Sequence, residues 1–308
     1  MRVVVTGAAG FLGSHVCERL ADHGHEVLGI DAFTDFYDRA LKRRNAEWLS
    51  DDLGIEVHEH DVLDPELSGE LLGATAVCHF AGMPGVRCRD PLQLERGNVE
   101  GTRTMMRAAA AAGVQRVLLA SSSSVYAPAG TPIDEDAPLE PLSEYGRSKR
   151  SAELVAAELA AEHDIELLVL RYFTVYGPRQ RPDMAFARFL SALHLREAMP
   201  LFGGGGQRRD FTYVSDAAEA TALALERGRA GAAYNVSGGR SVELSHALSV
   251  LAAEAGSAPP MAPEPANPEE HLVTEADLTR ATRDLGYRPG VALEDGIALQ
   301  VAAAAVPA

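Results

Sequence analysis

The chain has 308 residues, 46% of them hydrophobic and 23% charged, which suits a globular enzyme of one large domain or two intimately packed ones. Its net charge of −16 argues against a nucleic-acid partner, because phosphate backbones recruit basic surfaces. The three cysteines show no CxxC spacing and no partnering histidine cluster, which argues against structural zinc and a disulfide framework. No apolar run is long enough to cross a bilayer, so we expect a cytoplasmic protein without a membrane or metal partner.

The first thirty residues predict a dinucleotide-binding unit. The β-branched run at 3–5 is typical of a buried parallel strand, and it ends in a glycine-rich turn at 7–13. An amphipathic helix follows over 11–23, and a second buried strand over 26–30 ends at an acidic residue. This order of strand, glycine turn, helix, strand and acid is the opening of a dinucleotide-binding fold.

Each position of this unit has a physical reason. Gly7 permits the tight turn, Gly10 lets the backbone approach a pyrophosphate, and Gly13 lets the helix pack closely on the sheet. Asp31 can accept hydrogen bonds from both ribose hydroxyls and would repel a 2′-phosphate, which favours NAD over NADP. The predicted cofactor contacts in this unit are Gly7, Gly10, Phe11, Leu12, Gly13 and Asp31.

Strands and helices continue to alternate, which predicts an α/β fold with a doubly wound parallel sheet of the Rossmann type. The expected strands cover 55–58, 74–80, 114–120 and 165–170, and the expected helices cover 91–112 and 145–163. Further candidates for cofactor contact lie near the strand ends and on the first of these helices: Asp61, Val62, Phe80, Ala81, Gly82, Asn98 and Tyr172. We expect Asn98 to order its helix near the site rather than to act chemically.

The composition changes after residue 171, where proline and glycine become more frequent. We interpret residues 1–174 as an NAD-binding Rossmann domain and 175–308 as a smaller, mainly helical substrate domain. Segments around 213–235 are expected to return to the Rossmann domain. Ligands of open parallel sheets bind at the carboxyl ends of the strands, so the second domain is expected to cover that edge.

Two short stretches carry the candidate catalytic groups, SSSSVY at 121–126 and SEYGRSK at 143–149. Tyr145 and Lys149 are four residues apart, so on a helix both side chains leave one face. A tyrosine loses its proton near pH 10, and a neighbouring ammonium lowers that pKa towards neutrality. A hydroxyl of the serine run can share the proton that is moved. Alone, a YxxxK pattern is short enough to arise by accident on a charged amphipathic helix.

With its other motifs, the chain resembles the extended short-chain dehydrogenase/reductases, specifically the NAD-dependent nucleotide-sugar epimerases and dehydratases. The resemblance covers essentially the whole length. It rests on TGAAGFLG at 6–13, Asp31, NVEGT at 98–102, the serine run, YxxxK, LRYFTVYGP at 170–178 and RDFTYV at 209–214. Narrower stretches resemble the UDP-glucuronate 4-epimerases: DAFTDFYD at 31–38, GVR at 85–87, and FTVYGP at 173–178 followed by RPDM at 181–184.

The resemblance implies 4-epimerisation of a UDP-sugar, most closely of UDP-glucuronate to UDP-galacturonate, through a 4-keto intermediate and with NAD kept bound. It implies that Ser122 is the catalytic hydroxyl beside Tyr145, and that Lys149 also holds the nicotinamide ribose. It also implies a homodimer formed through the helices near 91–112 and 145–163. The substrate contacts that it implies or that chemistry suggests are Arg87, Ser122, Ser123, Ser124, Thr174, Arg181, Phe202, Gln207 and Arg209, with Arg209 on the diphosphate and Arg181 as a second cation.

The serine run also bears on the type of reaction. In the 4,6-dehydratases and the UDP-glucuronate decarboxylases of this family an acidic residue follows the hydroxyl, whereas Ser123 and Ser124 follow it here. Elimination needs a general acid and base, which disfavours a dehydratase. A 4-keto uronate loses carbon dioxide readily, so an epimerase must restrain the carboxylate. We hypothesise that Ser123, Ser124 and Thr174 do so through charge-assisted hydrogen bonds.

Three alternatives remain at the level of sequence. One is an epimerase of UDP-glucose or an N-acetylhexosamine derivative, one is a UDP-glucuronate decarboxylase, and one is a catalytically silent NAD-binding sensor. The late loop at 265–271 departs from the family by carrying no arginine. One cation expected near the nucleotide is therefore missing or supplied from elsewhere.

Overall fold

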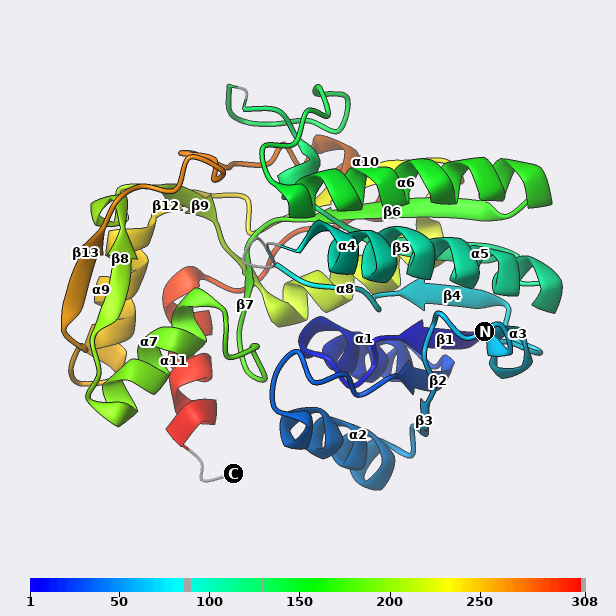
Figure 1. The fold of residues 1–308 in the computed structure, drawn as a ribbon, viewed down its shortest axis with the longest axis horizontal. Helices are drawn as coiled ribbons and strands as arrows, with labels where there is room; N and C mark the ends of the chain where they lie inside the picture. Colours follow the sequence, from blue (N-terminus) through cyan, green and yellow to red (C-terminus); the bar gives the residue numbers. More distant parts are fainter. Residues whose placement is uncertain (86–89, 129, 306–308) are drawn as a thin grey trace.

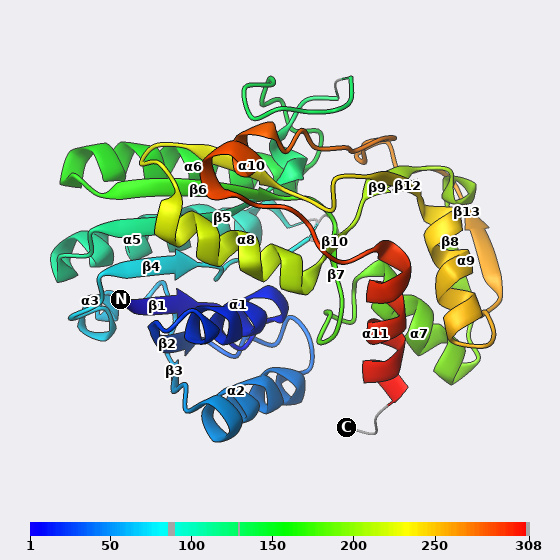
Figure 2. The same ribbon diagram turned by 180° about the vertical axis from the view of Figure 1, so that it is seen from behind.

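A parallel sheet of seven strands forms the centre of the molecule, in the order β11-β6-β5-β4-β1-β2-β3 (Figures 1 and 2). The computed structural model describes residues 1–85, 90–128 and 130–305. The strands of the sheet are β1 (Arg2–Thr6), β2 (Glu26–Asp31), β3 (Val57–Glu59), β4 (Ala76–His79), β5 (Arg116–Ser122), β6 (Glu166–Tyr172) and β11 (Ala233–Val236). All neighbours are parallel, and the order reverses between β1 and β4, which confirms the predicted doubly wound fold.

Successive residues of β1 enter two hydrophobic cores, one on each face of the sheet. Val3 and Val5 belong to one core and Val4 to the other, because side chains alternate across a strand. The first core contains residues of α1 (Phe11–Asp22) and α8 (Val214–Arg227), and the second contains residues of α5 (Gly101–Ala112) and α6 (Glu144–His163). Burial on both faces explains the continuous β-branched run in the sequence.

The helix expected over 91–112 is interrupted. It consists of α4 (Pro91–Leu94), a π-helical segment η1 (Glu95–Glu100) and α5. Glycines at 97 and 101 weaken regular helix here. The Asn98 amide in η1 donates to Met83 O at 3.1 Å and to Ser148 Oγ at 2.8 Å, which favours the altered winding. Such π-helical turns occur frequently at functional sites.

The second half of the chain combines helices with small sheets that the sequence did not predict. Its remaining helices are α7 (Ala185–Leu195), α9 (Leu244–Glu254), α10 (Thr279–Leu285) and α11 (Leu293–Ala305). Its strand pairs are β7 (Val175–Tyr176) with β10 (Thr212–Tyr213), β8 (Met199–Phe202) with β13 (Met261–Glu264), and β9 (Arg208–Asp210) with β12 (Ser241–Glu243). Helix α8 packs beside α1, and β11 extends the central sheet next to β6. Strands this short carry too little alternation to be found from sequence.

The remaining helices are α2 (Arg39–Leu53) and α3 (Leu67–Glu70), and the chain also forms the 3₁₀ turns η2 (Ser123–Val125) and η3 (Gly203–Gly205). Turn η2 follows β5 directly, and the serine run covers the last two residues of β5 and the first two of η2. The carboxyl end of β5 is therefore continuous with the residues expected to carry the chemistry.

The first turn of α6 packs on the backbone of the serine run. Ser143 caps the helix, its Oγ accepting a hydrogen bond from Gly146 N at 3.1 Å. A Cβ built on Gly146 would collide with Ser124 O and would lie 2.8 Å from Pro141 Cβ. Only glycine lets helix and serine run approach this closely, and this approach brings Tyr145 to the end of β5.

Replacing this glycine tests the packing. We expect Gly146→Ala to lower the free energy of unfolding by about 1–3 kcal/mol, as overpacking does, despite the better helix propensity of alanine. Urea denaturation measures the change. Gly69→Ala is the matched control, because a Cβ on Gly69 in α3 meets nothing within 4 Å. Equal stability of the two variants would contradict the close approach.

Candidate active site

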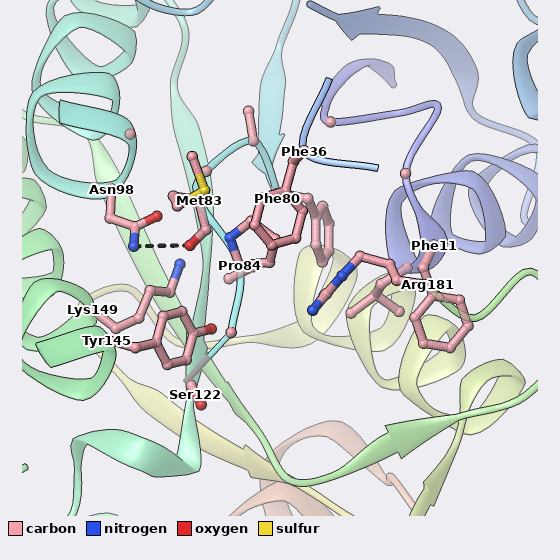
Figure 3. A pocket seen from close by; sticks show the side chains of 18 of the residues that line it. Phe11, Phe36, Phe80, Met83, Pro84, Asn98, Ser122, Tyr145, Lys149 and Arg181 are labelled. Carbon is pink, nitrogen blue, oxygen red and sulfur yellow. Dashed lines mark hydrogen bonds between the residues drawn. The ribbon is translucent and has the colours of Figure 1, made fainter. Parts of the chain in front are cut away.

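A pocket of about 760 Å³ lies at the carboxyl ends of the central strands and takes residues from both halves of the chain (Figure 3). Most of the residues selected from the sequence line it. They are Gly7, Gly10, Phe11, Leu12, Gly13, Asp31, Asp61, Val62, Phe80, Ala81, Gly82, Asn98, Ser122, Ser123, Ser124, Tyr145, Lys149, Tyr172, Thr174, Arg181 and Arg209. Segments that are distant in sequence therefore meet in one cavity.

The glycine turn has the shape of a cradle. Gly7 has φ +72°, and a Cβ there would lie 2.8 Å from Ala81 N. A Cβ on Gly13 would collide with Gly7 O, so α1 begins directly against the turn. A Cβ on Gly10 would meet only Gly7 O, at 3.1 Å, which leaves the pocket side of this backbone open. This cradle at a helix N-terminus fits a pyrophosphate.

Asp31 lies at the end of β2 beside this cradle and is 7% exposed. Its carboxylate accepts hydrogen bonds from Ala9 N at 3.1 Å and from Phe33 N at 2.8 Å. Burial raises its pKa, and the positive charge of Lys42 works in the opposite direction. A carboxylate has about four lone-pair sites, so acceptor capacity remains for ribose hydroxyls. Cradle and acid together fit a dinucleotide cofactor.

Lys42 is a pocket residue to which sequence reasoning assigned no role. It is 6% exposed, and its ammonium donates to Thr34 O at 3.0 Å and to Thr34 Oγ1 at 2.8 Å. It also lies 4.8 Å from the centre of the Tyr37 ring. The sequence offers one signal, because Leu41-Lys42 follows the DAFTDFYD stretch that resembles the UDP-glucuronate 4-epimerases. Other unassigned lining residues include Phe36, Met83, Asp183, Glu269, Glu270 and His271.

Tyr145 and Lys149 project from α6 into the pocket, with Ser122 at the end of β5 (Figure 3). Burial is the largest influence on Tyr145 and raises its pKa, whereas the charge of Arg181 and a hydrogen bond with Ser122 lower it. Burial lowers the pKa of Lys149 to about 8, and the charge of Glu153 opposes that change. Burial disfavours both the phenolate of Tyr145 and the ammonium of Lys149. The expected shift of the Tyr145 pKa towards neutrality therefore does not arise from the protein groups alone.

Asn98 connects three parts of the site. Its amide bonds reach Met83 O in the loop after β4 and Ser148 Oγ on α6, and Ser148 Oγ donates to Tyr145 O at 2.8 Å. Asn98 Oδ1 is buried and has no hydrogen-bond partner among the described residues. An orphaned acceptor on the pocket wall is a position that a bound ligand can satisfy.

Two of the arginines that line the pocket, Arg181 and Arg209, are already paired with carboxylates. Arg181 makes two bonds of 2.9 Å to Asp183. Arg209 donates to Glu270 at 3.0 Å and to His271 O at 2.7 Å. Glu270 and His271 belong to the late loop that lacks an arginine, so this loop brings negative charge where the sequence comparison led us to expect positive charge.

Two selected residues do not join the site, and a third is not described. Phe202 and Gln207 are not among the residues that line the pocket. Arg87 lies outside the residues that the structure describes. Within the described part of the chain, no group of three or more histidine, cysteine, aspartate or glutamate residues could hold a metal ion. In the same residues no helix is both long and apolar enough for a membrane span.

Comparison with known proteins agrees with this geometry. Residues 3–237 match the model of the NAD dependent epimerase/dehydratase family. The chain is 33% identical to an uncharacterized UDP-glucose epimerase, YtcB, of Bacillus subtilis, with 98% of this chain and 97% of that protein covered. It is 32% identical to a UDP-glucuronate 4-epimerase of Thermodesulfobacterium geofontis, with 96% and 93% covered.

A solved structure shows the same fold over the whole length. It is the UDP-glucuronic acid 4-epimerase from Bacillus cereus in complex with UDP-glucuronic acid and NAD. The TM-score is 0.94 at 34% identity, and 99% of each chain is covered. The shared framework therefore extends along the entire chain and includes the glycine cradle, Asp31 and the Tyr145–Lys149 pair. The chain belongs to the NAD dependent epimerase/dehydratase family.

Proposed function

We propose that this protein is a UDP-sugar 4-epimerase that uses bound NAD and interconverts UDP-glucuronate and UDP-galacturonate. The observation that carries the proposal is one pocket in which Tyr145, Lys149 and Ser122 face the glycine cradle while hydroxyls, not acids, follow Ser122. The similarity to a 4-epimerase crystallised with UDP-glucuronic acid and NAD supports the choice of sugar.

The protein residues would move protons while the carbon skeleton stays intact. NAD, which the glycine cradle and Asp31 would hold, would supply the hydride acceptor and donor for C4 of the sugar. Tyr145 removes the proton of the C4 hydroxyl, and Ser122, hydrogen-bonded to it, shares that proton. The positive charge of Arg181 favours the phenolate, and the Lys149 ammonium would act in the same direction. After the 4-keto sugar turns over, the hydride would return to C4 and the proton of Tyr145 to the C4 oxygen, so no net oxidation occurs.

The lining next to Ser122 favours epimerisation over related reactions. Ser123 and Ser124 offer hydroxyls where elimination needs an acid and a base. Thr174 lines the same pocket from the segment after β6. Charge-assisted bonds from these hydroxyls would hold a C6 carboxylate in the plane of the 4-ketone, where its carbon dioxide is not lost. An epimerase of neutral UDP-sugars would not require such a set of hydroxyls.

We also propose a homodimer formed through α5 and α6. Leu154 on α6 is 54% exposed, and Ala157 and Ala161 on the same helix are exposed as well. Small apolar side chains on exposed helices permit close approach of a second pair of helices. Size-exclusion chromatography with light scattering measures the mass.

Turnover of UDP-glucuronate tests the proposed activity. We expect the purified protein to form UDP-galacturonate, and Tyr145→Phe to lose at least about 100-fold in kcat because the proton acceptor is removed. Retained NAD in the variant shows that the cofactor site is intact. A UDP-pentose product would indicate a decarboxylase, and turnover of UDP-glucose alone would indicate the neutral-sugar epimerase. Full activity of Tyr145→Phe would contradict the assigned proton acceptor.

Removal of one hydroxyl tests control of the carboxylate. We expect Thr174→Ala to release carbon dioxide and UDP-pentose from UDP-glucuronate, because the 4-keto intermediate is held less firmly. Product analysis by mass spectrometry measures the ratio of pentose to uronate. Thr75→Ala, at an exposed position outside the pocket, is the control. If Thr174→Ala forms only uronate with unchanged KM, Thr174 does not hold the carboxylate.

The acidic partner of Arg209 provides a further prediction. A diphosphate bound at Arg209 must compete with Glu270, whose side chain is 32% exposed. We expect Glu270→Gln to tighten UDP binding by about 3- to 10-fold, in line with an ion pair of about 1 kcal/mol at a partly exposed site. Isothermal titration calorimetry measures Kd. Glu243→Gln is the matched control, because Glu243 pairs with the adjacent Arg208 outside the pocket.

A further inference from the structure

A buried ion pair lies behind the reaction centre and takes no part in the proton transfers. Glu153 on α6 and Arg171 on β6 are 4% and 5% exposed. Arg171 Nη2 lies 2.9 Å from Glu153 Oε2, and Nε lies 3.1 Å from Oε1. The free-energy cost of removing such a pair from water is about as large as the gain from its electrostatic attraction. A contribution to stability is therefore a weak explanation for this pair.

Glu153 is connected to two elements of the site, β5 and α6. Its Oε1 accepts a hydrogen bond of 2.5 Å from the hydroxyl of Ser121, the residue before Ser122 on β5. It also follows Lys149 by four residues on α6, so the two side chains occupy the same helix face. One carboxylate thereby joins the strand that carries the catalytic hydroxyl to the helix that carries Tyr145 and Lys149.

We propose that Glu153 is a positioning residue, which holds β5 against α6 and keeps Lys149 in its ammonium form. This inference rests on the proposed epimerase function. The charge of Glu153 raises the pKa of Lys149 and so opposes the effect of burial, which lowers it. Neither effect requires Glu153 to touch substrate or cofactor, and Glu153 is not among the residues that line the pocket.

The charges packed around Glu153 sharpen the expectation. On α6, Arg150 Nη1 is 3.7 Å from Oε2, and on β6 Arg171 makes the two bonds described above. The remaining titratable or charged groups of this environment are Tyr126 and Glu135, which bond to Arg171 through a hydroxyl and a backbone carbonyl, and His79 on β4, whose pKa Lys149 helps to lower. A neutral residue at 153 would leave two guanidinium groups without this carboxylate and would remove the charge that opposes the lowering of the Lys149 pKa by burial.

The pH dependence of Glu153→Gln tests this role. Glutamine retains an oxygen for Ser121 but removes the charge. We expect the alkaline limb of the kcat profile to move to lower pH by about one unit, while KM for UDP-glucuronate and the NAD content stay unchanged. Glu166→Gln is the control, because Glu166 pairs with Arg116 across the same two strands at their opposite ends. An unmoved alkaline limb in Glu153→Gln would overturn the proposal.

A second readout needs no turnover. The rate at which acetic anhydride acetylates Lys149, followed by mass spectrometry against pH, reports its uncharged fraction. We expect half-maximal acetylation of Glu153→Gln at a pH about one unit below that of the wild type. Equal titration of the two proteins would overturn the proposal even if no substrate is turned over. An inactive wild type with the expected shift of Lys149 would contradict only the proposed function.

Glu153→Asp separates the two parts of the role and serves if the glutamine variant does not fold. It retains the charge and shortens the reach to Ser121. We expect an unmoved alkaline limb with a kcat about 10-fold lower, since the strand and helix are less firmly held. Full kcat in Glu153→Asp would overturn the positioning of β5 against α6.

Discussion

The contact between the first turn of α6 and the end of β5 is the constraint on which the site depends. Gly146 lies against the backbone of Ser124, so no side chain separates the helix from the serine run. Deeper in the fold, Glu153 bonds to both Ser121 and Arg171 and joins α6 to β5 and β6. These contacts set how Tyr145 and Lys149 stand relative to Ser122. A shift of either element would separate a proton acceptor from its partners.

Ion pairs contribute to the electrostatics of the pocket. Two of its arginines, Arg181 and Arg209, each carry a carboxylate partner, and burial lowers the pKa of Lys149 to about 8. A ligand with a diphosphate and a carboxylate brings its own negative charge, so binding it means exchanging protein carboxylates for ligand oxygens. This exchange allows a chain of net charge −16 to accept an anionic nucleotide sugar.

The same pocket illustrates how reaction type can be selected within one family. Fold, glycine cradle and the tyrosine–lysine pair serve the hydride and proton transfers that the family shares. Ser123, Ser124 and Thr174 line the same pocket, and in the proposed function they would determine what happens to a 4-keto sugar after it forms. Hydroxyls can hold a carboxylate but are poor acids and bases for elimination. Specificity thus lies beside the redox centre, on η2 and on the segment after β6.

Local patterns in the sequence were enough to predict the doubly wound sheet, the glycine turn with Asp31, and the pair on α6, since each depends on residues close together along the chain. The tertiary structure alone decided the features made by distant segments. These include the three small sheets, the place of Lys42 in the pocket, and the bond between Arg209 and Glu270. It also decided that Arg181 is the cation that lowers the pKa of Tyr145. Charges act through space, and burial disfavours the charged form of a group. Spacing in the sequence therefore identifies the titrating groups but not the pKa values that result.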